Sequence, residues 1–269
     1  MEVEQPIYQT LKTFSIRTAD TPKPPTNKNY PRLYTHILCP FAERARIALA
    51  AKGVQYQTVN VDLDKKTSWH AAINGGVVPF LEIPDGTIIT ESKIIMEFVE
   101  EAFPTSNFSL LPEDPVLRAK MRIAVLNIDA YIPAYYGILI KRVYDEADFV
   151  KLRGIIQKLE DIIASNAGTP PYALGTKNPT QLDAHIFPLL ERHNSLKDTA
   201  LHWVWEHTHF ENYPHILKLL TAFRENPSFS GNKVLFTKPF FAEHIQQLVD
   251  TPIGGKVGLV LPENDDSDE

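Results

Sequence analysis

The chain has 269 residues, of which 43% are hydrophobic and 22% charged, proportions typical of a globular protein. This length exceeds the needs of one small hydrophobic core and predicts one large domain or two smaller ones. The formal net charge is −6, but the last seven residues carry five acids, which leaves 27 basic residues against 28 of the 33 acidic ones. A body so close to neutral offers no general attraction for nucleic acid, and we expect no nucleic-acid partner.

The N-terminal segment has acids where a signal peptide needs bases, and it contains no apolar core. No stretch approaches the roughly eighteen apolar residues of a membrane span, so none is expected. Cys39 is the only cysteine, which excludes an internal disulfide framework and fits a reducing compartment. We therefore expect a cytoplasmic protein.

Residues 1–29 end in "TPKPPTNKN", a proline-rich polar run that predicts an extension or linker rather than a core element. Regular patterning follows over residues 30–105, in the order strand, helix, strand, short helical connector, hairpin, helix. The predicted strands are "RLYTHIL", "YQTVNVDL" and the two arms of the hairpin, "VVPFLEI" and "TIIT", around Pro84-Asp85-Gly86. The first helix follows Cys39 and ends at Gly53, and Ser92 opens the second.

After Pro104 the apolar residues follow helical spacing. Those from Leu117 to Tyr135 predict one long helix, which Pro133 should kink. Further stripes lie at 152–163, 182–190, 216–223 and 240–249. The sequence therefore predicts an α/β domain over 30–105, an all-helical domain over 106–250 and an acidic C-terminal tail over 251–269.

Cys39 follows the first predicted strand and precedes Pro40, the residue type favoured at the first position of a helix. A lone cysteine is most often a small buried hydrophobe without chemistry. At a helix N-terminus, however, unpaired N–H groups and the helix dipole favour a thiolate and lower the pKa of the thiol. The position therefore favours a reactive thiol.

The residue three positions after Cys39 is Ala42 rather than a second cysteine. A C-x-x-C pair closes its own disulfide, whereas a disulfide formed by Cys39 must join another molecule and be resolved by a second external thiol. In a reducing compartment the abundant small thiol is glutathione. The spacing therefore indicates a monothiol exchange site.

Over roughly residues 31–230 the chain resembles the cysteine-type glutathione transferases, most closely the omega class. "CPFAERARIALAAKG" is similar to the active-site helix of that class, "VVPFLE" and "GTIITES" to its glutathione-binding half, "DKKTSW" to the lysine-bearing segment between them, and "PTQLDAHIFPLLER" to its sixth helix. The resemblance implies the glutathione transferase fold, in which a thioredoxin-like α/β domain precedes an all-α domain. It also implies a homodimer.

The resemblance makes Cys39 the catalytic nucleophile and glutathione the co-substrate, with no metal. In Val78-Pro79 it implies a cis proline that turns the Val78 backbone toward glutathione for strand-like pairing, the alternative being an ordinary edge-strand proline. Lys66 would bind a carboxylate of the ligand, with Lys65 as a substitute.

Glu91 and Ser92 match the pair that holds the γ-glutamyl end of glutathione. Ser92 is expected as the N-cap of a helix whose exposed N–H groups bind a carboxylate, while Glu91 accepts from the ammonium of the ligand. Without the resemblance, this pair predicts only a strand end and a helix cap.

Two features of the helical part are assigned from local pattern. Thr180 and Asp183 form an S/T-x-x-D capping box, which we interpret as structural. We hypothesise that an acceptor pocket is lined by Tyr131, Tyr135 and Tyr136, although aromatic residues at helical spacing more often belong to the core. The histidines of "HWVWEHTHF" match no common zinc pattern, and no metal site is expected there.

The implied function is a glutathione-dependent thiol transferase and dehydroascorbate reductase, in which Cys39 forms a mixed disulfide with glutathione and small oxidised or disulfide acceptors are substrates. Two alternatives remain on the same fold: a non-enzymatic redox-sensitive binding protein similar to the chloride intracellular channel proteins, and a carrier of hydrophobic ligands. The lambda and dehydroascorbate-reductase classes share the cysteine motif. The sequence departs from the omega pattern at Leu38, "NGGVVP" and Leu219, so the identity of the acceptor substrate is not predicted.

Overall fold

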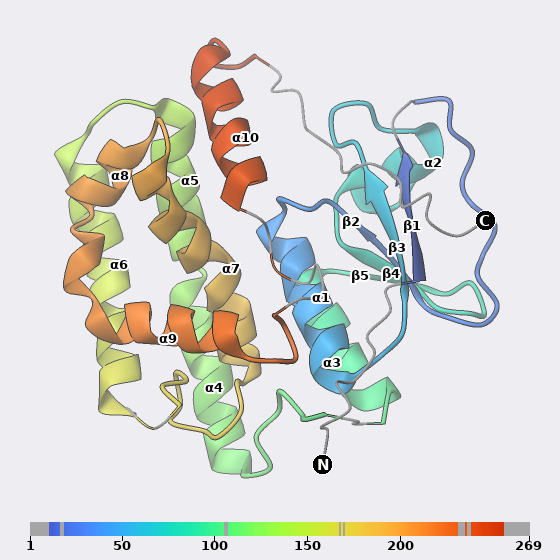
Figure 1. Cartoon of the computed structure of the whole chain (residues 1–269), viewed down its shortest axis with the longest axis horizontal. Coiled ribbons are helices and arrows are strands. Elements are labelled where there is room, and N and C mark those ends of the chain that lie inside the picture. The colour runs from blue at the N-terminus through green and yellow to red at the C-terminus, as the bar shows by residue number, and fades with distance from the viewer. Residues whose placement is uncertain are drawn as a thin grey trace. The chain divides into compact units, whose positions relative to one another are not determined.

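The computed structural model describes residues 11–16 (backbone), 19–104, 107–166, 168, 170–230, 235 and 238–255. These residues fall into two compact units (Figure 1). The N-terminal unit contains the described residues up to Phe108 together with 227–230 and 235, and the helical unit contains 109–226 and 238–255. Each unit is described separately below.

The N-terminal unit is built on a five-stranded sheet in the order β1-β3-β2-β4-β5. Strands β1, β3 and β2 are parallel, while β4 is antiparallel to both β2 and β5. The strands are β1 (Leu11–Ile16), β2 (Arg32–Thr35), β3 (Gln57–Val61), β4 (Phe80–Glu82) and β5 (Ile88–Thr90). Every residue of β2, β3 and β4 is buried, as expected for central strands covered on both faces.

Helices α1 (Pro40–Lys52) and α3 (Ser92–Ala102) pack on each other and cover one face of this sheet, while α2 (Ser68–Ala72) lies against the other (Figure 1). The 3₁₀ turn η1 (Asn74–Gly76) follows α2. Gly53 ends α1 with φ 74°, a left-handed conformation that glycine adopts without steric cost. The predicted order of strand, helix, strand, connector, hairpin and helix is confirmed.

The segment before β2 differs from its prediction as a linker. Residues 11–16 form strand β1, which pairs with β3, and an irregular register between Leu11 and Phe14 breaks the period-two pattern that would have marked a strand. Residues 19–30 are also tied to the sheet: Lys23 Nζ lies 2.6 Å and Thr26 Oγ1 3.0 Å from Glu82 Oε1. The N-terminal stretch therefore contributes to the folded unit. Residues 1–10, and 256–269 of the predicted acidic tail, lie outside the described part of the chain.

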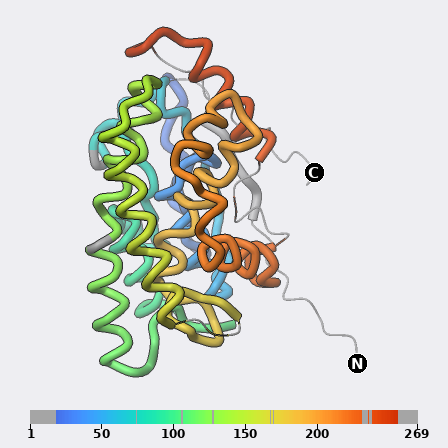
Figure 2. The backbone as a smooth tube through the Cα atoms, turned by 90° about the vertical axis from the view of Figure 1, so that its left-hand side faces the viewer, coloured from blue at the N-terminus to red at the C-terminus, as the bar shows by residue number. Residues whose placement is uncertain are grey.

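The helical unit contains α4 to α10, with short 3₁₀ turns η2 (Leu196–Asp198) and η3 (Phe210–Asn212). The α-helices are α4 (Pro115–Ile128), α5 (Tyr131–Lys141), α6 (Glu146–Ser165), α7 (Gln181–Ser195), α8 (His202–His207), α9 (Pro214–Glu225) and α10 (Lys238–Asp250). All residues of α7 are buried, so this helix is the centre of the unit. Figure 2 shows α4 and α5 following one another with α6 alongside.

The predicted long helix over Leu117–Tyr135 is instead two helices. It breaks at Asp129 and Ala130, upstream of the kink expected at Pro133. The displacement has a simple cause: a proline has no N–H to donate to the carbonyl four residues earlier, which is that of Asp129, and its ring clashes with that carbonyl. The interruption therefore falls before the proline, which lies in the first turn of α5.

By length and composition, the stretch Pro115–Lys141 does pass the test for a membrane span, contrary to the sequence analysis. The signal is weak, because core helices of globular domains pass the same test. Here the stretch is two helices, and side chains of each, such as Met121 and Ile138, are buried in the helical unit.

The capping box at the start of α7 is confirmed. Asp183 is fully buried and accepts hydrogen bonds from Thr180 N (2.7 Å), Thr180 Oγ1 (2.8 Å) and Ala173 N (2.7 Å). Burial raises the pKa of Asp183, and these hydrogen bonds oppose the rise. One carboxylate thus closes the α7 N-terminus and fixes the preceding loop.

Candidate active site

The predicted site residues of the N-terminal unit all adjoin one edge of the sheet. Cys39 follows β2 and Lys66 follows β3, and these strands are parallel. Val78 precedes β4, which is antiparallel to β2 with Tyr34 opposite Phe80. Glu91 and Ser92 follow β5, where Thr90 pairs with Phe80, so continuing the register brings them beside Pro79 and Val78. The topology therefore gathers residues that are up to 53 positions apart in the sequence.

Cys39 is the N-cap residue of α1, with φ −74° and ψ 117°, and Pro40 opens the helix as predicted. Its N–H donates to the carbonyl of His36 (3.0 Å) and its carbonyl accepts from Glu43 N (3.0 Å), so the backbone is fixed on both sides. The thiol is not in a disulfide and is half-buried, packed against the buried cluster that includes Tyr34 and Phe80. A half-buried thiol at a helix start has the placement expected of a reactive cysteine.

The peptide bond between Val78 and Pro79 is cis, as the resemblance implied. The Cys39 thiol donates to the carbonyl of Val78, with Sγ 3.8 Å from the oxygen. Val77 is 48% exposed, whereas Val78 is 8% exposed. The sulfur therefore lies beside a strand-like backbone segment that precedes β4.

Glu91, rather than Ser92, is the N-cap residue of α3; Ser92 is the first residue inside the helix. Glu91 has φ 67° and ψ 115°, a conformation rarely adopted by residues other than glycine. Its side chain is exposed, while Ser92 is 7% exposed. The two residues thus bring the start of a three-turn helix, which attracts anions, to the edge that carries Cys39.

Lys66 is exposed and extends over the turn before Val78. Its Nζ lies 3.5 Å from the carbonyl of Gly75, and a Cβ on Gly76 would lie 2.8 Å from its Cδ. Gly76 also has φ 70°, so a side chain at that position would be strained as well as crowded. Glycine therefore allows the lysine stem to lie against the turn.

Two positioning residues were missed by the sequence analysis. Arg46 is buried on α1, and its guanidinium binds Thr35 Oγ1 (2.8 Å) and the carbonyls of His36 (3.4 Å) and Ile37 (3.3 Å). It therefore fixes the turn that leads to Cys39. No local signal marked it, because α1 buries three other charged side chains, those of Glu43, Arg44 and Lys52.

His70 of α2, the second such residue, is 1% exposed, and its side chain hydrogen-bonds the backbone of Val77. Burial lowers the pKa of His70, and that hydrogen bond opposes the effect. Its Nε2 is buried and has no hydrogen-bond partner among the described residues. The histidine thus supports the backbone just before Val78.

The three tyrosines predicted for an acceptor pocket have different environments. Tyr131 and Tyr135 are each 1% exposed, and their stacked rings pack on His193, whose Nδ1 lies 2.7 Å from Tyr131 Oη. This favours the core alternative for both, because neither ring offers surface to a ligand. Tyr136 is half-buried and is the one of the three with surface to offer.

Within the described part of the chain, no group of three or more His, Cys, Asp or Glu side chains is placed to hold a metal ion. In the histidine-containing segment that begins α8, His202 Nδ1 and His207 Nδ1 lie near the carbonyls of Thr199 (3.3 Å) and Trp203 (2.8 Å). These contacts are local to the helix.

Comparison with known proteins identifies the family. The family model described as glutathione S-transferase, N-terminal domain, matches residues 38–102, which include Cys39, Val78 and Ser92. Glutathione S-transferase omega-1 of the pig, Sus scrofa, is 32% identical over 188 residues, covering 68% of this chain and 75% of the pig protein. The chain belongs to the omega-like glutathione transferases.

Two further relatives agree with this assignment. Glutathione S-transferase omega-1 of the mouse, Mus musculus, is 27% identical to this transferase over 225 residues, 82% of this chain and 87% of the mouse protein. Among solved structures, a trimeric glutathione transferase of Leishmania matches with a TM-score of 0.72 at 24% identity, over 82% of this chain and 48% of that one. The Leishmania structure supports only the assignment of the fold.

The implied fold is confirmed: the omega-like transferase has a thioredoxin-like α/β sheet with its helices, followed by a helical region. Membership of the family also makes it an enzyme of glutathione transfer and favours this over the non-enzymatic alternative of the sequence analysis. Its half-buried cysteine, strand-like backbone and helix N-terminus are suited to an extended thiol peptide with a terminal carboxylate.

Proposed function

We propose that this omega-like transferase is a glutathione-dependent thiol transferase and dehydroascorbate reductase with Cys39 as its nucleophile. The observation that carries the proposal is the position of the Cys39 sulfur, half-buried at the N-cap of α1 and 3.8 Å from the Val78 carbonyl. With Ala42 three residues later and no second cysteine in the chain, this sulfur is suited to form a disulfide with a small external thiol.

The chemistry consists of two thiol–disulfide exchanges. The Cys39 thiolate attacks the glutathione sulfur of a mixed disulfide; the new bond joins Cys39 to glutathione, and the acceptor leaves as a thiolate that takes up a proton. A second glutathione thiolate then attacks the glutathione sulfur of the adduct, which releases oxidised glutathione and regenerates Cys39. With dehydroascorbate, two glutathione molecules supply the two electrons and two protons.

The remaining predicted residues are proposed to hold glutathione. The Val78 backbone, turned by Pro79, pairs with the cysteinyl unit of glutathione in strand fashion. The N–H groups at the start of α3, with Ser92, bind the γ-glutamyl carboxylate, and Glu91 accepts from the neighbouring ammonium. Lys66 binds the other carboxylate. Of the three tyrosines predicted for the acceptor pocket, only Tyr136 is proposed to contact the acceptor, since Tyr131 and Tyr135 are buried.

The test is turnover with reduced glutathione and a glutathionylated small thiol as the acceptor, repeated with dehydroascorbate. Cys39→Ala and Cys39→Ser should both lose thiol transfer at least a hundredfold while retaining wild-type circular dichroism, because the lost sulfur is at a helix end. Intact mass after treatment with oxidised glutathione should show a single adduct on the wild type and none on either variant.

The serine variant also separates two mechanisms. A hydroxyl cannot form a disulfide but can donate a hydrogen bond to a glutathione thiolate, so Cys39→Ser should gain slight conjugation of glutathione to an electrophilic arene. Wild-type reduction of mixed disulfides by Cys39→Ser would contradict the proposal.

A cytoplasmic homodimer is proposed as the working form. The dimer is supported by exposed apolar side chains on α4: Val116 is 62%, Ile123 59% and Leu126 70% exposed, at spacings that place them along one side of the helix. Light scattering should give twice the chain mass for the wild type and the single mass for Leu126→Lys. A wild-type monomer, or a trimer, would contradict the homodimer.

A further inference from the structure

Residues 19–30 lie between β1 and β2 in the chain and form the blue loop at the right-hand edge of Figure 1, beside α2. Three of them are prolines, at positions 22, 24 and 25, which makes the segment stiff and extended. Its backbone is held at two points: the carbonyl of Thr21 accepts from Trp69 Nε1 of α2 (2.9 Å), and that of Pro24 accepts from Arg32 Nη1 of β2 (3.2 Å). The segment therefore has a defined place in the N-terminal unit.

Side chains of the same segment bind a buried carboxylate of β4. Glu82, the last residue of that strand, is 1% exposed, and its Oε1 accepts from Lys23 Nζ (2.6 Å) and Thr26 Oγ1 (3.0 Å). Arg32 Nη1 and Tyr34 Oη lie 3.4 Å and 3.3 Å from its Oε2. Because a buried carboxylate is stable only with such partners, the segment and the end of β4 hold each other in place.

Helix α2 is tied to this segment on one side and to the candidate site on the other. Trp69 and His70 are neighbours in the helix; the Trp69 indole donates to Thr21, and the His70 ring hydrogen-bonds the backbone of Val77. With five residues, Ser68–Ala72, α2 is too short to be stable by its own backbone hydrogen bonds. Its position therefore depends on tertiary contacts such as these two.

The turn that carries Val78 runs from α2 to β4, and residues 19–30 hold both of these elements, α2 through Trp69 and β4 through Glu82. The Val78 carbonyl lies 3.8 Å from Cys39 Sγ, and the stem of Lys66 lies against the same turn at Gly76. A shift of α2 against β4 would therefore move both the Val78 backbone and Lys66.

We propose that Trp69 and Lys23 are positioning residues for glutathione. By holding the N-terminal segment to α2 and to β4, they keep the Val78 backbone and Lys66 at the spacing that the ligand needs. These roles rest on the proposed function, since Val78 and Lys66 are taken as binding residues. The effect falls on the affinity for glutathione rather than on the attack of the Cys39 sulfur, because both residues act through the backbone of other elements.

The first experiment measures binding without turnover. Glutathione is titrated calorimetrically into Cys39→Ser, which cannot form a disulfide, and into the same protein with a second substitution. Trp69→Phe keeps an aromatic ring but loses the N–H that reaches Thr21, and should bind glutathione at least fivefold more weakly. Lys23→Met keeps the length of the side chain but loses the ion pair with Glu82, and should bind at least threefold more weakly.

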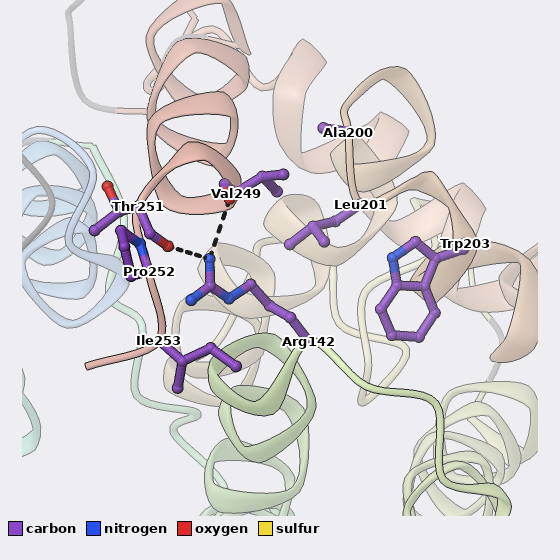
Figure 3. A pocket seen from close by; sticks show the side chains of 8 residues that line it. All are labelled: Arg142, Ala200, Leu201, Trp203, Val249, Thr251, Pro252 and Ile253. Atoms are coloured by element: carbon purple, nitrogen blue, oxygen red, sulfur yellow. Dashed lines mark hydrogen bonds between the residues drawn. The ribbon is translucent and has the colours of Figure 1, made fainter. Parts of the chain in front are cut away.

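Two matched controls carry the same substitutions elsewhere. Trp203 lines a cavity of the helical unit (Figure 3); it is half-buried and packs on two other rings, as Trp69 does, but among the residues drawn there no hydrogen bond reaches its indole. Lys28 is an exposed lysine of the same N-terminal segment. Trp203→Phe and Lys28→Met should keep the affinity of Cys39→Ser within a factor of two. An equal loss in a control and its matched variant would contradict the positioning roles.

The titrations also separate failure of these roles from failure of the proposed function. Binding of glutathione to Cys39→Ser with the same affinity after Trp69→Phe would overturn the positioning role alone. No binding of glutathione to Cys39→Ser would remove the proposed binding site, and the positioning roles with it.

With Cys39 intact, steady-state kinetics separate positioning from a merely structural role. Trp69→Phe should raise the KM for glutathione at least fivefold and leave kcat within a factor of two, with wild-type circular dichroism. A destabilised protein would instead lose kcat, because a smaller fraction of the enzyme is folded. A fall in kcat at unchanged KM would overturn the proposal.

Discussion

At the scale of single residues, the backbone of Glu91 is the most unusual feature of the candidate site. With φ 67° and ψ 115° it occupies a conformation that costs a residue other than glycine roughly 1–3 kcal/mol. Its exposed carboxylate stands at the N-terminus of α3, where the proposed glutathione ammonium would bind. A glycine would satisfy the backbone but would supply no carboxylate.

Glycine and alanine at position 91 separate these two effects. Both variants lose the carboxylate and should bind glutathione more weakly than the wild type by calorimetry. In urea denaturation, Glu91→Gly should have the higher free energy of unfolding by about 1 kcal/mol, because alanine retains the strain. Equal stability of the two variants would argue against strain, and wild-type affinity in both would remove Glu91 from the site.

His193 is a second residue whose environment predicts a measurable effect. It is fully buried in the helical unit between Tyr131 Oη (2.7 Å) and Thr208 Oγ1 (2.9 Å), and burial lowers its pKa to about 3. Thr208 donates to the carbonyl of Val204 (3.0 Å), so His193 Nε2 donates to Thr208 and Nδ1 accepts from Tyr131.

Acid should therefore destabilise the fold through His193. Between its unfolded pKa of about 6.5 and its folded pKa of about 3, only the unfolded state binds the proton, so stability falls as the pH falls. From pH 7 to pH 5 this residue should account for a loss of about 2 kcal/mol. His193→Gln should be less stable at pH 7 but lose about 2 kcal/mol less over that interval in urea denaturation. Identical pH dependence in both proteins would contradict this account.

At the scale of the element, the start of α7 depends on one buried carboxylate. Asp183→Ala leaves Thr180 N, Ala173 N and Thr180 Oγ1 without their acceptor, and two of these are backbone groups. The free energy of unfolding should fall by about 3 kcal/mol, since each buried polar group left unpaired costs about 1–3 kcal/mol. Asp183→Asn retains one oxygen, so its free energy of unfolding should lie between those of the wild type and Asp183→Ala. A loss below about 1 kcal/mol in Asp183→Ala would show that the loop finds other partners.

Elements with strong local signals were predictable from sequence, and those set by tertiary contacts were not. Gly53, Pro40 and the Thr180–Asp183 box mark helix ends through their own chemistry, and the structure has those ends. By contrast, β1 was missed because its register is irregular and its pairing partner, β3, lies some forty residues further along the chain. The N-cap of α3 was placed one residue late because serine is a common cap, while Glu91 takes that position in a strained backbone.

At the scale of the whole molecule, the residues of the candidate site could be predicted from the sequence, but the buried side chains that hold them in place could not. Cys39, Val78 and Ser92 were found because their motif resembles a family, and parallel strand topology explains why they meet at one sheet edge. Arg46 and His70 were missed, since nothing in the local sequence distinguishes a buried supporting side chain from an exposed one.

The central claim, that Cys39 forms a mixed disulfide with glutathione at this edge, is tested most directly by a crystal structure of the enzyme treated with oxidised glutathione. We predict continuous density from Cys39 Sγ to the glutathione sulfur, the cysteinyl backbone paired with Val78, and the γ-glutamyl carboxylate at the first turn of α3. A free Cys39 thiol, with glutathione bound elsewhere or its sulfur directed to another side chain, would contradict the account.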